Sequence, residues 1–175
     1  MDRYLSPKRK KWVYFFTIIT LVSASIGIAY VYEVYFNYRF TVVSANKVYR
    51  SGEMPPEELQ KRVKQYGIKT VIDLRNQGDD HNNAIEKEHL AMKQVGVKHI
   101  NLASQQVPRD ETVDKFLKIM QEKKNLPVLI HCYHGIGRAV LYSAAYRIEF
   151  EGWSNGVFYN RKMTLFYNLN LTHPG

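Results

Sequence analysis

The sequence predicts a three-layer α/β domain with a mainly parallel central sheet flanked by helices, plus one N-terminal transmembrane helix. The helix is indicated by residues 12–32, which contain no charged side chain. The domain is indicated by the region after residue 46, where short apolar runs alternate with amphipathic stretches that end at glycine. Strands that alternate with helices in this way are typical of parallel sheets covered on both faces. A chain of 175 residues has room for one such domain and a short appendage.

The N-terminal region has the charge pattern of a single-pass membrane anchor. At about 1.5 Å per residue, a helix over 12–32 would be about 31 Å long, close to the thickness of a bilayer core. Residues 1–11 form a basic tail, which favours a cytoplasmic location for that end. The rest of the chain after Glu33 would then be exported, in a bacterium from the inner membrane into the periplasm. Ser23-Ala24-Ser25 leaves a cleaved signal peptide open as the alternative.

The exported part divides into a linker over residues 33–45, expected to be extended, and a folded domain over residues 46–175. Strands are expected where short runs are rich in apolar and β-branched residues, and helices where apolar residues recur every three or four positions. A proline pair at 55–56 opens the first of these helices, and a glycine at 67 ends it. The expected strands are 47–51, 69–74, 97–102 and 126–131. The expected helices are 57–66, 84–95, 109–123, 138–150 and 154–169, with polar loops at 75–83 and 103–108 between them.

A short glycine-containing turn follows the strand 126–131 and contains the only cysteine, Cys132. Ligands of parallel sheets bind beyond the carboxyl ends of the strands, next to helix N-termini. Gly135 and Gly137 would let the backbone approach a ligand closely, and amide groups and the helix dipole would attract an anion. Arg138 at the start of the helix can grip two oxygens of a phosphate. A thiolate held beneath that phosphate is a nucleophile for phosphorus, so the turn predicts phosphoryl chemistry.

The stretch His131-Cys-x-x-Gly-x-x-Arg138 also resembles the signature of cysteine-dependent protein tyrosine and dual-specificity phosphatases. The resemblance extends from about Val48 to Trp153, through VYRSGEMPPEEL, GIKTVIDLR, GVKHINL, PVLIHC and AAYRIEFEGW. It is strongest to the compact bacterial branch that contains exported TpbA-type tyrosine phosphatases. The resemblance implies the three-layer phosphatase fold, hydrolysis through a phosphocysteine intermediate, and no cofactor.

The same resemblance implies a role for each residue of the turn. Cys132 would be the nucleophile, Arg138 would bind the phosphate in the ground and transition states, and His131 would order the turn by hydrogen bonding. His134 could steer an anionic substrate or be an ordinary surface histidine. Arg75 could add positive charge to the site or pair with an aspartate, Asp73 or Asp80. The implied substrate-binding set is His131, Tyr133, His134, Gly135, Ile136, Gly137 and Arg75.

Two positions depart from the family pattern. Ala139 stands where the family usually has Ser or Thr, whose hydroxyl stabilises the thiolate, so hydrolysis of the phosphoenzyme is expected to be slow. Gln105 stands near the usual place of the aspartate that protonates the leaving group, a step worth about 10²–10⁴-fold. Asp110 is the candidate general acid, although a helix-starting role fits it as well. Asp79 and Asp80 in the loop 75–83 are a second possibility, and a site without an acid is the third.

Three functions therefore stay open. The leading one is a membrane-anchored phosphatase for phosphotyrosine, and for phosphoserine or phosphothreonine, in exported proteins. The second is a phosphatase for small polyphosphates of the inositol pyrophosphate type, with Lys69 and Arg75 as candidate sources of positive charge. The third is a tethered module that binds phosphorylated ligands or holds a long-lived phosphocysteine.

The net charge of +9 suits anionic partners, but no basic stripe with interleaved aromatic residues indicates nucleic acid. No metal site is expected either, because ligand-like spacing is absent among the histidines outside the turn. These histidines are His81, His89, His99 and His173.

Overall fold

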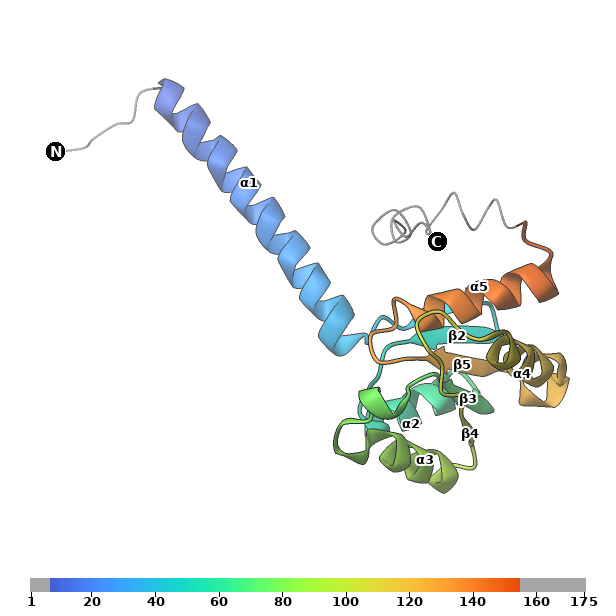
Figure 1. The fold of residues 1–175 in the computed structure, drawn as a ribbon. Coiled ribbons are helices and arrows are strands. Elements are labelled where there is room, and N and C mark those ends of the chain that lie inside the picture. The colour runs from blue at the N-terminus through green and yellow to red at the C-terminus, as the bar shows by residue number, and fades with distance from the viewer. Residues whose placement is uncertain (1–6, 155–175) are drawn as a thin grey trace. The chain divides into compact units, whose positions relative to one another are not determined.

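The computed structural model of the chain describes residues 7–154, so the helix expected at 154–169 lies outside the described residues. The chain divides into two compact units, Met1–Arg39 and Phe40–Gly175. The first unit consists of the helix α1, Pro7–Val31, and a π-helical turn η1, Tyr32–Phe36, that continues it (Figure 1).

The segment Arg9–Phe36 is long and apolar enough to cross a membrane, and none of its apolar window is buried against protein. Length and composition of this kind are shared by membrane spans and signal sequences. Its polar side chains bond within the helix. Thr17 Oγ1 donates to the carbonyl of Val13 at 2.8 Å, and Ser25 Oγ donates to that of Leu21 at 2.9 Å. Hydroxyl groups satisfied in this way can be placed in an apolar environment at low cost.

The second unit is a five-stranded sheet between two pairs of helices, which confirms the predicted fold class. The strand order is β1-β2-β5-β3-β4, with β1 antiparallel to β2 and the other neighbours parallel. Helices α2 and α3 cover one face, and α4 and α5 cover the other (Figure 1). The strands are β1 Thr41–Ser44, β2 Val48–Ser51, β3 Thr70–Asp73, β4 Lys98–Asn101 and β5 Val128–His131. The main helices are α2 Pro56–Gln65, α3 Ala84–Gln94, α4 Asp110–Gln121 and α5 Arg138–Glu151, and the short 3-10 turns are η2 Gln77–Asp79, η3 His81–Asn83 and η4 Lys123–Asn125.

The register of the parallel strands aligns their carboxyl ends in one row. Ser51 of β2 and Asp73 of β3 both face His131 of β5, and Asp73 also faces Asn101 of β4. Strands β3 and β5 are buried along their whole length because helices cover both faces of the sheet. The row of strand ends therefore contains buried polar groups that need partners. These partners make up the candidate site.

The structure differs from the sequence expectation over residues 33–45. This segment is not an extended linker: η1 continues the first helix to Phe36, and β1 joins the sheet as an antiparallel edge strand. The reason is burial, since the Phe40 ring packs 5.6 Å from the Tyr49 ring and 4.7 Å from the Tyr66 ring, measured between centroids. Aromatic and β-branched residues form strands readily where a neighbouring strand and a core are available.

Candidate active site

The turn over residues 132–137 joins β5 to α5 at the carboxyl end of the sheet, as the sequence predicts. Cys132 lies at its base and is only 2% exposed. The Gly135 N–H lies 3.3 Å from Cys132 Sγ and donates to it. At least one backbone amide of the turn therefore points inward at the sulfur. This is the inward arrangement of amide groups that an anion site requires.

Close packing against the end of β2 holds this turn. Gly135 has φ +71°, and a Cβ atom there would lie 2.4 Å from the backbone nitrogen of Gly52, so only glycine fits. Two further bonds join the same segments. The Glu53 N–H donates to the Tyr133 carbonyl at 3.0 Å, and Arg50 Nη1 donates to the Gly135 carbonyl at 2.8 Å. The conformation of the turn is thus set by the neighbouring strand as well as by its own glycines.

Arg138 is the first residue of α5 and is 4% exposed. Its Nη1 donates to the Leu74 carbonyl at 2.8 Å and to the Ser104 carbonyl at 3.1 Å. The same nitrogen lies 2.7 Å from Asp79 Oδ2. Its Nε is buried and has no hydrogen-bond partner among the described residues. A buried guanidinium N–H without an acceptor is costly, and an oxygen of a bound anion would satisfy it.

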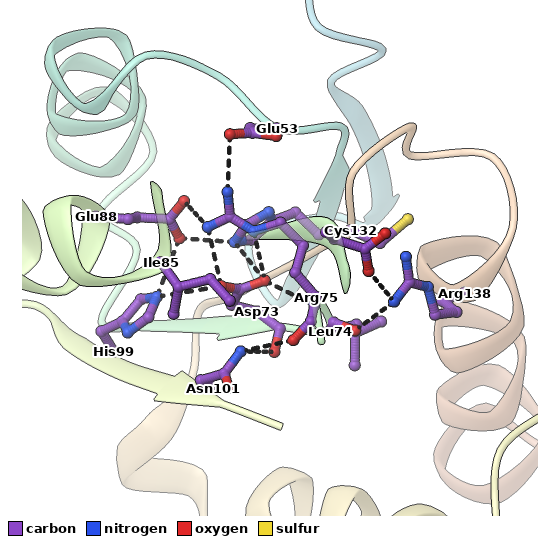
Figure 2. A network of polar contacts seen from close by, with 12 residues as sticks. Glu53, Asp73, Leu74, Arg75, Ile85, Glu88, His99, Asn101, Cys132 and Arg138 are labelled. Atoms are coloured by element: carbon purple, nitrogen blue, oxygen red, sulfur yellow. Dashed lines mark hydrogen bonds and ion pairs between the residues drawn. The ribbon is translucent and has the colours of Figure 1, made fainter. Parts of the chain in front are cut away.

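A second arginine, Arg75, lies at the centre of a network of carboxylates (Figure 2). Its Nε and Nη2 each lie 2.9 Å from a carboxylate oxygen of Asp73, and Nη2 lies 2.7 Å from Glu88 Oε2. Its Nη1 lies 2.9 Å from Glu53 Oε1. Burial alone would lower the pKa of Arg75, but the bond to Asp73 and the charge of Glu88 raise it instead. Arg75 is completely buried and contacts three carboxylates, so its observed contacts are those of the pairing role, one of the two roles that the sequence left open.

His131 belongs to the same network. Its Nε2 lies 2.7 Å from Glu88 Oε1, and His99 Nε2 lies 3.1 Å from the same oxygen. Burial would lower the pKa of His131, but the charges of Glu88 and Asp73 outweigh burial and raise it. Burial would likewise raise the pKa of Glu88, but the charge and hydrogen bond of His131 hold it well below its usual range. The sequence predicted that His131 orders the turn by hydrogen bonding; the hydrogen bond that the structure shows for its side chain goes to Glu88 of α3.

Four groups of the network are close enough to share a metal ion. One ligand atom from each of Asp73, Glu88, His99 and His131 lies within 4.8 Å of the others. Sequence spacing did not reveal this grouping, because the four residues come from β3, α3, β4 and β5. However, Arg75 already bonds both carboxylates, and a cation would have to compete with its guanidinium. Ion pairing accounts for the group without a metal.

The carboxylates considered as general acids lie in different places. Asp110 is exposed in the first turn of α4, where the helix dipole favours it, and no hydrogen bond or ion pair joins it to the described residues of the turn. Asp80 Oδ1 accepts the Ile85 N–H at 2.9 Å at the start of α3. Asp79 alone among them contacts Arg138. Gln105 is exposed, whereas Gln106 Oε1 would lie 3.1 Å from a Cβ placed on Gly137, so Gln106 is the glutamine side chain beside the turn.

The outer surface of the turn is aromatic. Tyr133 is 37% exposed, and its ring lies 4.7 Å from the His134 ring and 5.6 Å from the His81 ring. Ile136 of the same turn is also exposed. The sequence-predicted residues of the turn are therefore together in one site, with Tyr133, His134 and Ile136 facing outward and Cys132 buried.

Comparison with known proteins agrees with this geometry. A family described as "DSP-PTPase phosphatase fused to NAD+ Kinase" matches residues 28–164. TpbA from P. aeruginosa shares the fold with 24% identity and a TM-score of 0.58, over 72% of this chain and 73% of TpbA. TpbA has also been solved in complex with phosphotyrosine.

Two other solved structures are similar over comparable lengths. A putative phosphatase from Shewanella putrefaciens CN-32 has 25% identity and a TM-score of 0.58, over 77% of this chain and 83% of that protein. The core catalytic domain of the PP-IP phosphatase SIW14 from S. cerevisiae has 21% identity and a TM-score of 0.59, over 71% and 74%. No match was found among curated proteins.

Proposed function

Because the chain belongs to the DSP-PTPase phosphatase family, we propose that it hydrolyses phosphomonoesters through a phosphocysteine intermediate on Cys132. The observation that carries this proposal is the state of Arg138. It is buried beside the turn, and its Nε–H has no acceptor among the described residues, whereas its Nη1 contacts two carbonyls and the Asp79 carboxylate. A tetrahedral oxyanion in the turn would complete its hydrogen bonding.

The chemistry proceeds in two displacements. In the first, the Cys132 thiolate attacks phosphorus, the bond from phosphorus to the ester oxygen breaks, and that oxygen leaves with a proton from an acid or from water. In the second, a water oxygen attacks phosphorus and loses one proton to the conjugate base of that acid or to solvent, the sulfur–phosphorus bond breaks, and hydrogen phosphate and the thiolate are released. Arg138 and the amide groups of the turn stabilise the charge on the phosphoryl oxygens in both steps.

The surroundings of the turn favour phosphotyrosine in proteins over a polyphosphate as the substrate. The aromatic surface of Tyr133, His134 and His81 offers stacking partners for a phenyl ring. Lys69 and Arg75, the candidate sources of positive charge for a polyphosphate substrate, are not placed to bind one at the turn. Arg75 is buried in its carboxylate network, and Lys69 precedes β3, at the opposite end of that strand from the turn.

In our proposal α1 is a membrane anchor with the domain on the exported side. The support is the absence of charge over residues 12–32 together with the basic residues of the tail 1–11. The substrates would then be phosphoproteins at or beyond the outer face of the inner membrane, and the catalytic domain would occupy the periplasm.

The test is pre-steady-state release of a phenol from an aryl phosphate by the full chain in detergent, beside Cys132→Ser. An aryl leaving group hardly needs an acid, so the assay isolates the first displacement. We expect a burst of about one phenol per chain followed by slower turnover, and neither in Cys132→Ser. A wild-type chain that shows no burst and no turnover above Cys132→Ser would instead be a phosphate-binding module.

A further inference from the structure

The segment 76–83 follows β3 and contains a carboxylate that its own backbone holds in place. Asn76 Oδ1 accepts the Gly78 N–H at 2.9 Å, and Asp79 Oδ2 accepts the Asn76 N–H at 3.2 Å. These reciprocal bonds form a capping box around the turn η2. Asp79 is therefore oriented by local structure, independently of any contact with α5.

The same oxygen of Asp79 that accepts from Asn76 also lies 2.7 Å from Arg138 Nη1. Nη1 is in addition the nitrogen that donates to the carbonyls of Leu74 and Ser104. All three acceptors are thus on one side of the guanidinium, and the Nε–H on the other side has none among the described residues. Because the guanidinium is planar and three acceptors restrain its Nη1, its remaining N–H groups have a fixed orientation.

A second contact joins the same segment to the turn. The His81 ring lies 5.6 Å from the Tyr133 ring in an edge-to-face arrangement, which is a favourable geometry for aromatic rings. The segment 76–83 is thus in contact with the residue after Cys132 as well as with Arg138.

The charge of Asp79 decides between two roles. Burial alone would raise the pKa of this carboxyl, but the bonds from Arg138 and from the Asn76 N–H lower it. The group is therefore an anion before the substrate arrives, which suits a partner of Arg138 and does not suit a proton donor.

We infer that Asp79, carried by the segment 76–83, is a positioning residue that fixes the orientation of Arg138 toward the phosphate. The expected effect of Asp79 on turnover rests on the proposed function. Its expected effect on phosphate binding does not, because that effect requires only that Arg138 binds phosphate. The inference gives a role to a carboxylate that is distant in sequence from the turn. That role differs from the general-acid role considered for the positions of Gln105 and Asp110.

The experiment compares Asp79→Asn with Asp80→Asn in the full chain in detergent, with thermal unfolding measured for each. Asp80 is the matched control because it is the adjacent carboxylate and contacts the start of α3. For each variant we would measure kcat and KM on two aryl phosphates with leaving groups of different acidity, and Kd for inorganic phosphate. Arg138→Lys and the double variant Asp79→Asn/Arg138→Lys complete a cycle.

We expect Asp79→Asn to lower kcat/KM by about 10–100-fold on both esters, the range for a misplaced binding group, and to weaken phosphate binding. Asp80→Asn should leave both quantities unchanged. The double variant should have the same kcat/KM as Arg138→Lys. Once the guanidinium is absent, Asp79 has no group to orient, so its substitution should cause no further loss.

Three results would overturn the inference. A loss confined to the poorer leaving group would make Asp79 a proton donor. Stronger phosphate binding in Asp79→Asn would make it an internal competitor of the substrate. Losses that multiply in the double variant would show that it acts independently of Arg138. Failure of the proposed function would be seen separately, as equal activity of wild type and Cys132→Ser, and the phosphate-binding comparison would still decide the role of Asp79.

Discussion

Two buried arginines lie at the carboxyl end of the same sheet and are used in different ways. Arg75 directs its guanidinium at three carboxylates, those of Asp73, Glu88 and Glu53 (Figure 2). Arg138 is paired with one carboxylate, that of Asp79, and with two backbone carbonyls, and its Nε–H has no acceptor within residues 7–154.

We infer from this contrast that the completeness of its pairing distinguishes a structural arginine from a ligand-binding one at this end of the sheet. Both residues are buried and both follow or flank a strand end, so burial and position alone do not distinguish them. A buried charge is tolerated when protein groups satisfy it, and a protein retains an unsatisfied one where a ligand completes it. Substitution of each arginine, a pH series and a substitution at Ala139 test this distinction.

Arg138→Met should abolish most of the activity while leaving the fold intact. We expect kcat/KM to fall by about 10³–10⁴-fold, because more than one donor to the phosphoryl oxygens is lost and each is worth about 10²–10³-fold. The free energy of unfolding should fall by about 1–3 kcal/mol, because the buried carbonyls of Leu74 and Ser104 lose a donor whereas Asp79, the carboxylate left behind, is partly exposed. Steady-state kinetics and urea unfolding measure the two quantities. A large loss of stability with modest loss of activity would reverse the assignment.

Arg75→Met should show the opposite pattern. Removing this guanidinium leaves the buried carboxylates of Asp73 and Glu88 with only the two histidines, among the described residues, as neighbours that can carry positive charge, so the free energy of unfolding should fall by about 3–5 kcal/mol. The measurement is urea unfolding at neutral pH, beside Arg138→Met as the matched variant. If Arg75→Met is as stable as wild type but inactive, Arg75 belongs to the substrate site after all.

The Arg75 network should also make stability depend on pH through His131. The charges of Glu88 and Asp73 outweigh burial and raise the pKa of His131 above its usual value of 6.5. The folded chain therefore holds this proton to higher pH than the unfolded chain does. The resulting stabilisation is fully present below pH 6.5 and is lost as the pH rises from 6.5 through the raised pKa.

The measurement is urea unfolding of wild type and His131→Asn at a series of pH values above 6.5. Wild type should lose stability over this range, and His131→Asn should show a flatter dependence. Equal slopes would mean that His131 does not hold an extra proton in the fold. The groups facing His131 are Glu88, Asp73, His99 and Arg75.

Ala139→Ser should produce the smallest effect, and on turnover alone. Ala139 is completely buried at the start of α5. A hydroxyl there, as in most of the family, would stabilise the departing thiolate by one hydrogen bond of about 0.5–1.5 kcal/mol. Steady-state kcat should rise by about 2–10-fold with an unchanged burst amplitude. An unchanged kcat would show that hydrolysis of the phosphoenzyme does not limit the rate.

Local sequence patterns were sufficient for the elements of the domain and for the turn. The apolar runs over 69–74 and 126–131 and the glycines after Cys132 are features of a few consecutive residues, and the structure places them as expected. The segment 33–45 was misjudged, because whether an aromatic, β-branched stretch becomes a strand depends on a partner strand that lies elsewhere in the chain.

The partners of the two arginines could not be predicted because they are distant in sequence. As a glutamate in an amphipathic helix, Glu88 is expected at the surface. However, it follows Ile85 by three positions and precedes Met92 by four, which places it on the side of the helix that faces the core. That spacing was the available signal. Asp79 had a similar signal in the Asn76-x-x-Asp79 pattern of a capping box, but nothing local indicated Arg138 as its partner.

The carboxylate network around Arg75 also has a consequence for how this chain can diverge. A single substitution at position 75 or 88 removes one partner of a buried ion pair and leaves the other charge in the interior. Exchange of the whole group for apolar residues can instead leave the stability of the fold unchanged. Among diverging relatives these positions are therefore expected to covary, being kept as a set or replaced as a set. Evolutionary change at this edge of the sheet would then proceed in steps of several residues.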